Sequence, residues 1–373
     1  MKACRNRRAA VIGLAVLWTL PAGAEACALR DALAGVPAPV LMGGDAVLAS
    51  FVGLRDLRET EAFKARKPPR LADRLYPAVS SDTLQALLRN DAAKTRANWR
   101  EKTGLAIADL SSFLIFGAPP NTVTIWRFDG KDGAGSFLEG LASRGFTKSA
   151  DGGVSNGEPL KMDLSKRDEA NPFAGPLGRA SMLAPAAGGV AQSSSPRYIA
   201  ALRAMAAPGF ASLPPVAAAL DGLEKVAGNA LVPQATVLGV GAWTPGVAGM
   251  TERNPRILEG GAPPAAVAIV ADVETAAPAR RGAVFAIGYP DCDTAAKASA
   301  RFARSWREDA DGGGKTPRER TGAEPVTQEV AGDKSCAAVI SLTVPAGKEA
   351  GNQVYGYILN ALVRRDFKAI QGR

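Results

Sequence analysis

The chain has 373 residues, 47% of them hydrophobic, and is therefore long enough for two domains or one large domain with a sizeable core. It contains no histidine, which excludes Ser-His-Asp and Cys-His catalytic sites and His-ligated zinc, copper or iron. Four of the nine net positive charges lie in the first eight residues, and the remaining five are spread along the chain without a basic stripe that alternates with aromatic residues, so nucleic-acid binding is not expected.

The N-terminus has the three-part pattern of a secretory signal peptide. The basic segment MKACRNRR precedes an apolar run over 9–20, and small residues follow up to Ala24. The apolar run is shorter than the roughly 20 residues that a membrane-spanning helix needs. Glu25 and Ala26 do not suit lipid attachment at Cys27. We therefore predict cleavage after Ala24 and a periplasmic or secreted protein without a transmembrane segment.

The first half of the mature chain is predicted to mix helices with strands. Residues 25–44, rich in Ala, Pro and Gly, are expected to be irregular. A strand over 46–54 follows. An amphipathic helix over 82–102 then begins after Ser80 or Ser81, either of which suits the N-cap position.

The most apolar stretch after the leader predicts a hairpin, with strands over 111–116 and 122–128 joined by Gly-Ala-Pro-Pro-Asn. Its second strand is apolar on both faces, as is typical of a strand covered on both sides. The remaining elements predicted in this half are a helix over 134–144, a polar loop over 166–176, strands over 179–184 and 190–193, and helices over 196–206 and 215–227.

The second half is predicted to follow a similar order. A strand over 235–243 precedes a loop rich in Gly and Pro. The later elements are a hairpin of strands over 265–273 and 283–289, a helix over 294–307, strands over 326–330 and 337–344, and a helix over 351–364.

The order hairpin, acidic turn, helix, strands, helix thus occurs twice, and Thr122 aligns with Ala283. This order suits an antiparallel or mixed sheet with helices on one face, as in ferredoxin-like α+β units. Sequence identity between the halves is slight, so chance agreement is the alternative. We expect a signal peptide over 1–24 and two similar α+β halves, 25–232 and 233–373.

Three cysteines remain after signal cleavage: Cys27, Cys292 and Cys336. An oxidising compartment permits disulfides. Cys292 starts a predicted helix and Cys336 starts a predicted strand of the same half, so we predict that these two pair and that Cys27 stays unpaired. Three separate thiols are the alternative.

No motif in the sequence identifies a reaction, and no catalytic, cofactor-binding or metal-binding residue is predicted. The segment GGGKT over 312–316 resembles the end of a phosphate-binding loop, but Asp309 stands where the pattern requires Gly, and Pro317 interferes with the following helix. Asp-Gly segments near 129–133 and 309–312 lack the closing Glu of a calcium loop. The patterns S-x-x-K and G-x-S-x-G are absent.

Two functional hypotheses remain. The preferred one is a soluble, exported, non-enzymatic accessory or binding protein of the cell envelope, with an unknown protein or envelope partner and no cofactor. The alternative is a histidine-free periplasmic hydrolase that acts on glycan or cell-wall material through carboxylates. An exposed apolar surface would favour the first, and a deep cleft with converging carboxylates would favour the second. A ligand groove lined by Trp99, Trp126 and Trp243 is also considered, although the positions of Trp99 and Trp126 favour core packing.

Overall fold

The computed structural model describes residues 25–363 except 43–47, 65–69, 77–80, 92–94, 118–120, 131, 205–207, 240–266, 312 and 348–350. The predicted signal peptide and Trp243 lie outside these residues. The chain forms an α+β structure around one large antiparallel sheet, which confirms the predicted fold class at that level. No helix within the described ranges is long and apolar enough to cross a membrane.

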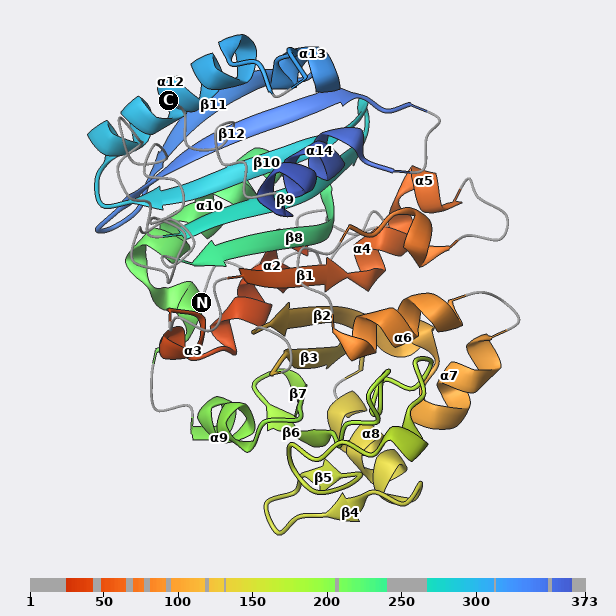
Figure 1. Cartoon of the computed structure of the whole chain (residues 1–373). Coiled ribbons are helices and arrows are strands. Elements are labelled where there is room, and N and C mark those ends of the chain that lie inside the picture. The colour runs from red at the N-terminus through yellow and green to blue at the C-terminus, as the bar shows by residue number, and fades with distance from the viewer. Residues whose placement is uncertain are drawn as a thin grey trace, which may run out of the picture.

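Twelve strands of the described ranges are hydrogen-bonded in the order β11-β12-β10-β9-β8-β1-β2-β3-β7-β6-β5-β4 (Figure 1). β1 and β8 pair at the middle, so both halves of the chain share one sheet. The strands are β1 Leu48–Gly53, β2 Leu110–Phe116, β3 Val123–Phe128, β4 Thr147–Lys148, β5 Val154–Ser155, β6 Met182–Ala186, β7 Gly189–Ser193, β8 Leu231–Gly239, β9 Val267–Ala276, β10 Ala279–Tyr289, β11 Glu324–Ala331 and β12 Cys336–Pro345.

The two predicted hairpins are present as β2–β3 and β9–β10. In β2–β3, Phe113 pairs with Trp126 and Leu114 with Ile125. Successive residues of a strand point to opposite faces, so these pairs supply apolar side chains to both sides of the sheet. β9 and β10 run further toward their shared turn than predicted. The additional residues include polar ones, and Glu274 of β9 pairs with Arg281 of β10.

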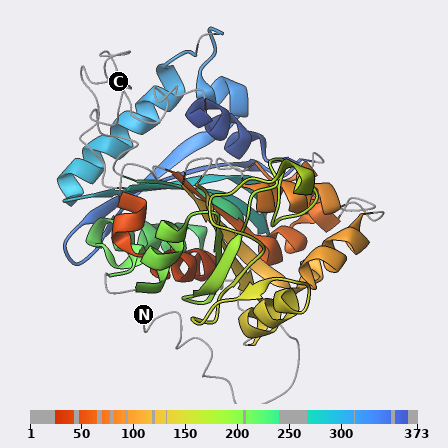
Figure 2. The same ribbon diagram turned by 60° about the horizontal axis from the view of Figure 1, so that its bottom comes forward.

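Helices cover both faces of the sheet (Figure 2). α2, α9 and α10 pack on one face and form the central core with strands from both halves. On the other face, α12 and α14 cover the second half, and α4, α6, α7 and α8 cover the first. The α-helices are α2 Glu25–Ala34, α3 Ala38–Met42, α4 Leu54–Glu59, α5 Glu61–Lys64, α6 Asp82–Asn90, α7 Arg96–Thr103, α8 Gly133–Ala142, α9 Pro196–Ala204, α10 Pro214–Ala227, α12 Cys292–Glu308, α13 Pro317–Thr321 and α14 Gln353–Val363.

Three sequence-based expectations are corrected by this arrangement. Helices lie on both faces rather than on one, because the central strands are apolar on both sides. Residues 25–42 are not irregular, since α2 and α3 form there and Leu29 and Leu33, four residues apart, bury one face of α2. The helix expected over 82–102 is two helices, α6 and α7, and α6 ends at Asn90.

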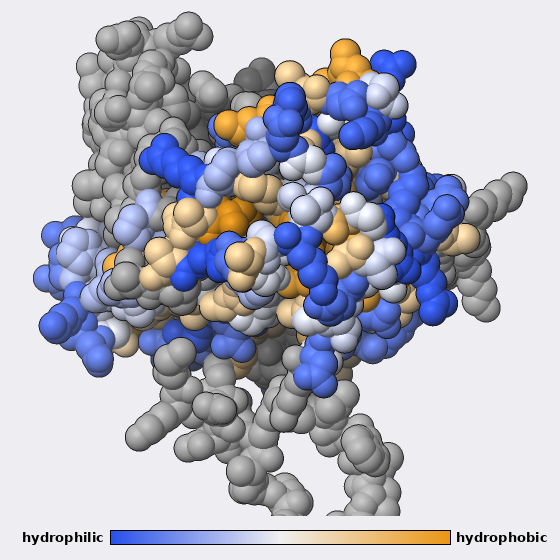
Figure 3. Space-filling model, turned by 90° about the horizontal axis from the view of Figure 1, so that it is seen from below, coloured by the Kyte–Doolittle hydropathy of each residue, from blue (hydrophilic) through white to orange (hydrophobic). Residues whose placement is uncertain are grey.

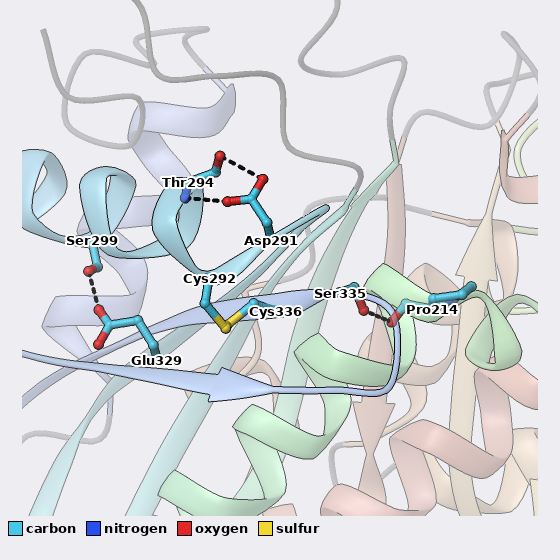
Figure 4. Close-up of a disulfide and its surroundings, with 8 residues drawn as sticks. All are labelled: Pro214, Asp291, Cys292, Thr294, Ser299, Glu329, Ser335 and Cys336. Carbon is cyan, nitrogen blue, oxygen red and sulfur yellow. Dashed lines mark hydrogen bonds between the residues drawn. A yellow bond between two sulfur atoms is a disulfide. The ribbon is translucent and has the colours of Figure 1, made fainter.

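The predicted disulfide between Cys292 and Cys336 is present, with 4.9 Å between the Cα atoms (Figure 4). It joins the first residue of α12 to the first residue of β12. Asp291 caps the same helix, because its carboxylate accepts hydrogen bonds from the N–H and hydroxyl of Thr294. The expectation that Cys27 stays unpaired is wrong, because Cys27 is also disulfide-bonded.

Candidate functional site

A set of buried charged and polar side chains lies on the sheet face that carries α12 and α14, beside the segment 70–76. We call it the buried ion network. Its members come from β8, β9, β10, α14's N-terminus and the segment after α5. They are Arg74, Gln234, Asp272, Glu274, Arg281 and Asn352, and none is more than 5% exposed.

Asp272 is the centre of the buried ion network. Its carboxylate accepts hydrogen bonds from both terminal nitrogens of Arg74, with Nη2 at 2.9 Å from Oδ1. Gln234 Nε2 donates to it at 2.8 Å and Asn352 Nδ2 at 2.6 Å. Burial alone would lower the pKa of Arg74, but the carboxylates of Asp272 and Glu274 raise it, so the guanidinium stays charged.

Glu274 extends the buried ion network toward the surface of the fold. Its Oε2 lies 3.4 Å from Arg74 Nη2 and 2.9 Å from Arg281 Nε, and its Oε1 accepts the backbone N–H of Glu61 at 2.8 Å. Arg74 and Glu61 belong to the first half of the chain, whereas Asp272, Glu274 and Arg281 belong to the second. The network therefore ties the two halves together through buried ion pairs.

The sequence carries one local signal for this network. Asp272 and Glu274 alternate with apolar residues in the segment VAIVADVET, which places both carboxylates on one face of a buried strand. Buried carboxylates require partners, so this alternation predicts cations nearby. Arg74 lies about 200 positions earlier in a short segment without periodicity, and no local pattern identifies it.

A small pocket opens between the N-terminus of α6, the strands β3 and β7, and the segment 173–181. Its cavity of about 30 Å³ has room for one or two water molecules. Hydroxyl groups predominate in the lining, which consists of Ser81, Asp82, Thr83, Thr122, Thr124, Phe173, Arg179, Ala180, Ser181, Gln192, Ser193 and Ser194.

Gln192 holds the pocket walls together. Its side-chain oxygen accepts hydrogen bonds from Thr83 Oγ1 at 2.9 Å and from Trp126 Nε1 at 2.8 Å. Its amide nitrogen donates to the carbonyl oxygen of Pro172 and to Ser181 Oγ. Gln192 is buried, and both the oxygen and the nitrogen of its side-chain amide are hydrogen-bonded. The side chains that line the pocket are therefore held in place without a ligand.

Asp82 and Arg179 supply the charges in the pocket. Burial raises the pKa of Asp82, and the positive charge of Arg179 acts in the opposite direction. Gly175 has a positive φ of 60°, and a Cβ there would clash with the carboxylate of Asp82. Glycine at 175 therefore lets the segment approach α6 closely. Asp82 is the one carboxyl group among the lining residues.

An apolar surface lies beside this pocket on the segment 156–181. Leu160, Met162 and Leu164 are 61%, 58% and 63% exposed, and we call these three side chains the ledge. The Leu160 N–H donates to the carbonyl oxygen of Ser194, a pocket residue, at 3.2 Å. Met162 forms a β-bridge with Arg179, another pocket residue. Figure 3 shows the surface seen from below, where hydrophobic residues lie among hydrophilic ones.

Trp99 and Trp126 are core positions, and the segment near 309–316 is a turn. Trp99 and Trp126 are 0% exposed and stack with ring centroids 5.8 Å apart, which confirms core packing. Near 309–316, the carboxylate of Asp311 accepts the N–H groups of Gly313 and Lys315 and pairs with Arg320. Hydrogen bonding from Arg320 lowers the pKa of Asp311 to about 2. This segment is an Asp-centred turn, and Gly312 itself lies outside the described residues.

The described residues contain no group of three or more Cys, Asp or Glu side chains placed to hold a metal ion. No protein-family model, curated protein or solved structure matches the chain significantly, so the site has to be interpreted from its own geometry.

Proposed function

We propose that this chain is an exported, periplasmic, non-enzymatic accessory or binding protein of the cell envelope, and that it binds a macromolecular partner at the ledge and the adjoining pocket. The observation that carries the proposal is the ledge itself. Three large apolar side chains extend into solvent from a segment that is fixed by backbone hydrogen bonds. Exposed apolar surface of this kind is characteristic of interaction sites.

The ledge is energetically unfavourable in the isolated chain. Full burial of a Leu or Met side chain stabilises a folded protein by roughly 1.5–3 kcal/mol. More than half of each ledge side chain stays exposed and does not gain this stabilisation. Leu160 also has a positive φ of 61°, which costs a residue with a Cβ about 1–2 kcal/mol. A partner that covers the ledge would offset these costs, whereas no contact within the described chain does so.

The hydrolase hypothesis depends on Asp82, whose pKa burial raises as a general acid requires. A glycosidase needs a second carboxyl group roughly 5–10 Å from the first. The pocket lining supplies none beyond Asp82, and its cavity is smaller than a sugar ring. Binding is therefore the better-supported function for this site. Hydrolysis of purified cell-wall glycan that is abolished by Asp82→Asn would favour the enzyme instead.

The partner can be sought by photo-crosslinking in the periplasm. A photoreactive phenylalanine analogue replaces Met162 on the ledge, and a matched control replaces Glu101, an exposed residue of α7. We expect a discrete product from position 162 only, and the captured molecule, once identified and purified, should bind the wild type but not Leu164→Ser. Equal products from both positions, or none, would contradict a binding role for the ledge. Mass spectrometry of the exported protein should find Glu25 as its first residue.

We further infer that the halves 25–232 and 233–373 derive from one repeated unit. The strand order supports this. In each half three successive strands, β1-β2-β3 or β8-β9-β10, lie side by side in antiparallel order and are followed by a helix, and a later strand then pairs with the third of them. The two units meet at β1 and β8, where the expected boundary lies at the start of β8.

A further inference from the structure

We propose that the ledge binds an extended segment of a partner polypeptide, which adds a strand alongside Met162 and places an acidic side chain against Arg167. This inference rests on the proposed binding function and specifies the chemistry of the partner. It depends on three independent features of the segment 156–181, all of which the structure describes: an unpaired backbone edge, the spacing of the apolar side chains, and the balance of charges.

The backbone edge is at Met162. The N–H of Ala180 donates to the carbonyl oxygen of Lys161, and the N–H of Asp163 donates to the carbonyl oxygen of Gly178. The neighbours of Met162 thus direct their backbone groups toward the strand that contains Arg179, and Met162 directs its own to the opposite side. Neither its N–H nor its C=O has a hydrogen-bond partner among the described residues. A donor and an acceptor are therefore available to another strand.

The ledge side chains occur at every second residue. Leu160 lies in a turn with a positive φ of 61°, and Leu164 begins a short 3-10 helix, but Asp163 between Met162 and Leu164 is extended, with φ −128° and ψ 96°. Side chains two apart across an extended residue are separated by about 6.6 Å and point to the same face, so the match to a partner strand concerns Met162 and Leu164. A partner strand beside Met162 would place its own alternate side chains at the same spacing, in contact with Met162 and Leu164. Apolar residues at every second position of the partner match this surface. The pocket next to the ledge is large enough for one small polar group from the same partner.

The charges of the segment 156–181 indicate which charge the partner should carry. The basic residues Lys161, Lys166, Arg167 and Arg179 balance the acidic residues Glu158, Asp163, Asp168 and Glu169. All four acids are already paired: Glu158 with Lys161, Asp163 with Lys166, Asp168 with Lys102 and Glu169 with Arg89.

Arg167 is exposed and has no acidic partner among the described residues. Complementarity therefore calls for an acidic residue in the partner. An anionic membrane surface is disfavoured, because such a surface attracts segments with a clear excess of cations.

The test is selection of phage-displayed random twelve-residue peptides on the mature wild-type protein. Selected peptides should share alternating apolar residues and one acidic residue. Arg167→Glu should weaken their binding about tenfold, and exchange of the peptide's acidic residue for Lys should restore it, because the charge pair is reversed. The matched control is Arg304→Glu, an exposed arginine of α12, which should leave affinity within about twofold.

Hydrogen exchange measures the backbone contact without any substitution. Peptide binding should slow exchange of the Met162 amide, whose N–H is unpaired in the free protein, and should leave the Asp163 amide, which is already bonded, little changed. Selected peptides that bind without protecting Met162, or whose affinity is insensitive to Arg167→Glu, would overturn the proposal.

Two other results would also overturn it. One is preferential binding to vesicles that contain phosphatidylglycerol. The other is self-association in analytical ultracentrifugation that Leu164→Glu abolishes, because the occupant would then be a second copy of this chain. If no peptide is selected but crosslinking from position 162 still captures a specific partner, the strand-addition mode is wrong and the proposed binding function stands.

Discussion

The buried ion network and the ledge both cost the folded chain free energy, but the fold offsets the cost only in the network. Asp272, fully enclosed, accepts hydrogen bonds from Arg74, Gln234 and Asn352, so the cost of burying its charge is offset inside the fold. Leu160 and its ledge neighbours have the opposite problem, since they are apolar groups left in water without a covering contact. A buried charge with hydrogen-bond partners indicates a structural role, whereas the exposed apolar groups are the basis of the proposed binding role.

The two regions should therefore respond differently to substitution. The network joins residues of the two halves, and its members should determine stability. The ledge contacts little of the fold, and its members should determine binding while changing stability slightly or favourably.

The largest effect is expected for Asp272→Ala. This change leaves the buried cation of Arg74 with Glu274 as its remaining carboxylate partner, so unfolding free energy should fall by about 3–5 kcal/mol. Urea denaturation at neutral pH measures it. A loss below about 1 kcal/mol, the value typical of an exposed pair, would show that the network is not a structural connection between the halves.

The next largest change in stability is expected from the ionisation of Tyr289, a buried residue of β10. Burial raises the pKa of its phenol to about 12, above the value of about 10 in an unfolded chain. The protonated form is therefore favoured by folding, so this contribution is fully present below pH 10 and is lost as pH rises toward 12. Stability should fall by up to about 3 kcal/mol across that range. In Tyr289→Phe the decrease should be correspondingly smaller, and an unchanged pH profile would contradict this assignment.

A smaller effect of opposite sign is expected for Leu160→Asn. Asn adopts a positive φ more readily than Leu, and it removes an apolar group from solvent, so the variant should be more stable by about 1 kcal/mol. Thermal unfolding of the variant beside the wild type measures the change. A destabilised variant would mean that Leu160 makes packing contacts that the fold requires.

The smallest effect on stability is expected for Leu164→Ser. Its side chain is 63% exposed, so the unfolding free energy should change by less than about 0.5 kcal/mol. Partner binding should nevertheless weaken clearly, because the ledge loses one of its three apolar groups. Parallel denaturation and binding measurements check both. Retained binding would exclude Leu164 from the contact surface.

Elements with dense local signals could be predicted from the sequence. Apolar runs interrupted by turn residues predicted the hairpins that became β2–β3 and β9–β10. The placement of Cys292 and Cys336 at element starts predicted their disulfide, because both starts fall in the same half. The sequence does not predict α2, because Ala, Pro and Gly in its neighbourhood favour a loop, although Leu29 and Leu33 have helical spacing.

The candidate site could not be predicted because its parts come from distant segments. Ser81, Thr124, Arg179 and Gln192 meet only once the sheet order places β3 beside β7. The ledge has a local signal, since Leu160, Met162 and Leu164 alternate with polar residues as in a strand. The pattern does not reveal that these side chains remain exposed, because alternation usually indicates one buried face.

The most direct test of the central claim is one pair of measurements on Leu160→Asn, namely its unfolding free energy and its affinity for the partner identified by crosslinking. If the ledge is kept exposed for binding at the expense of stability, the variant should gain about 1 kcal/mol in stability and bind about tenfold more weakly. A variant that binds as tightly as the wild type, or that loses stability and affinity together, would contradict the account.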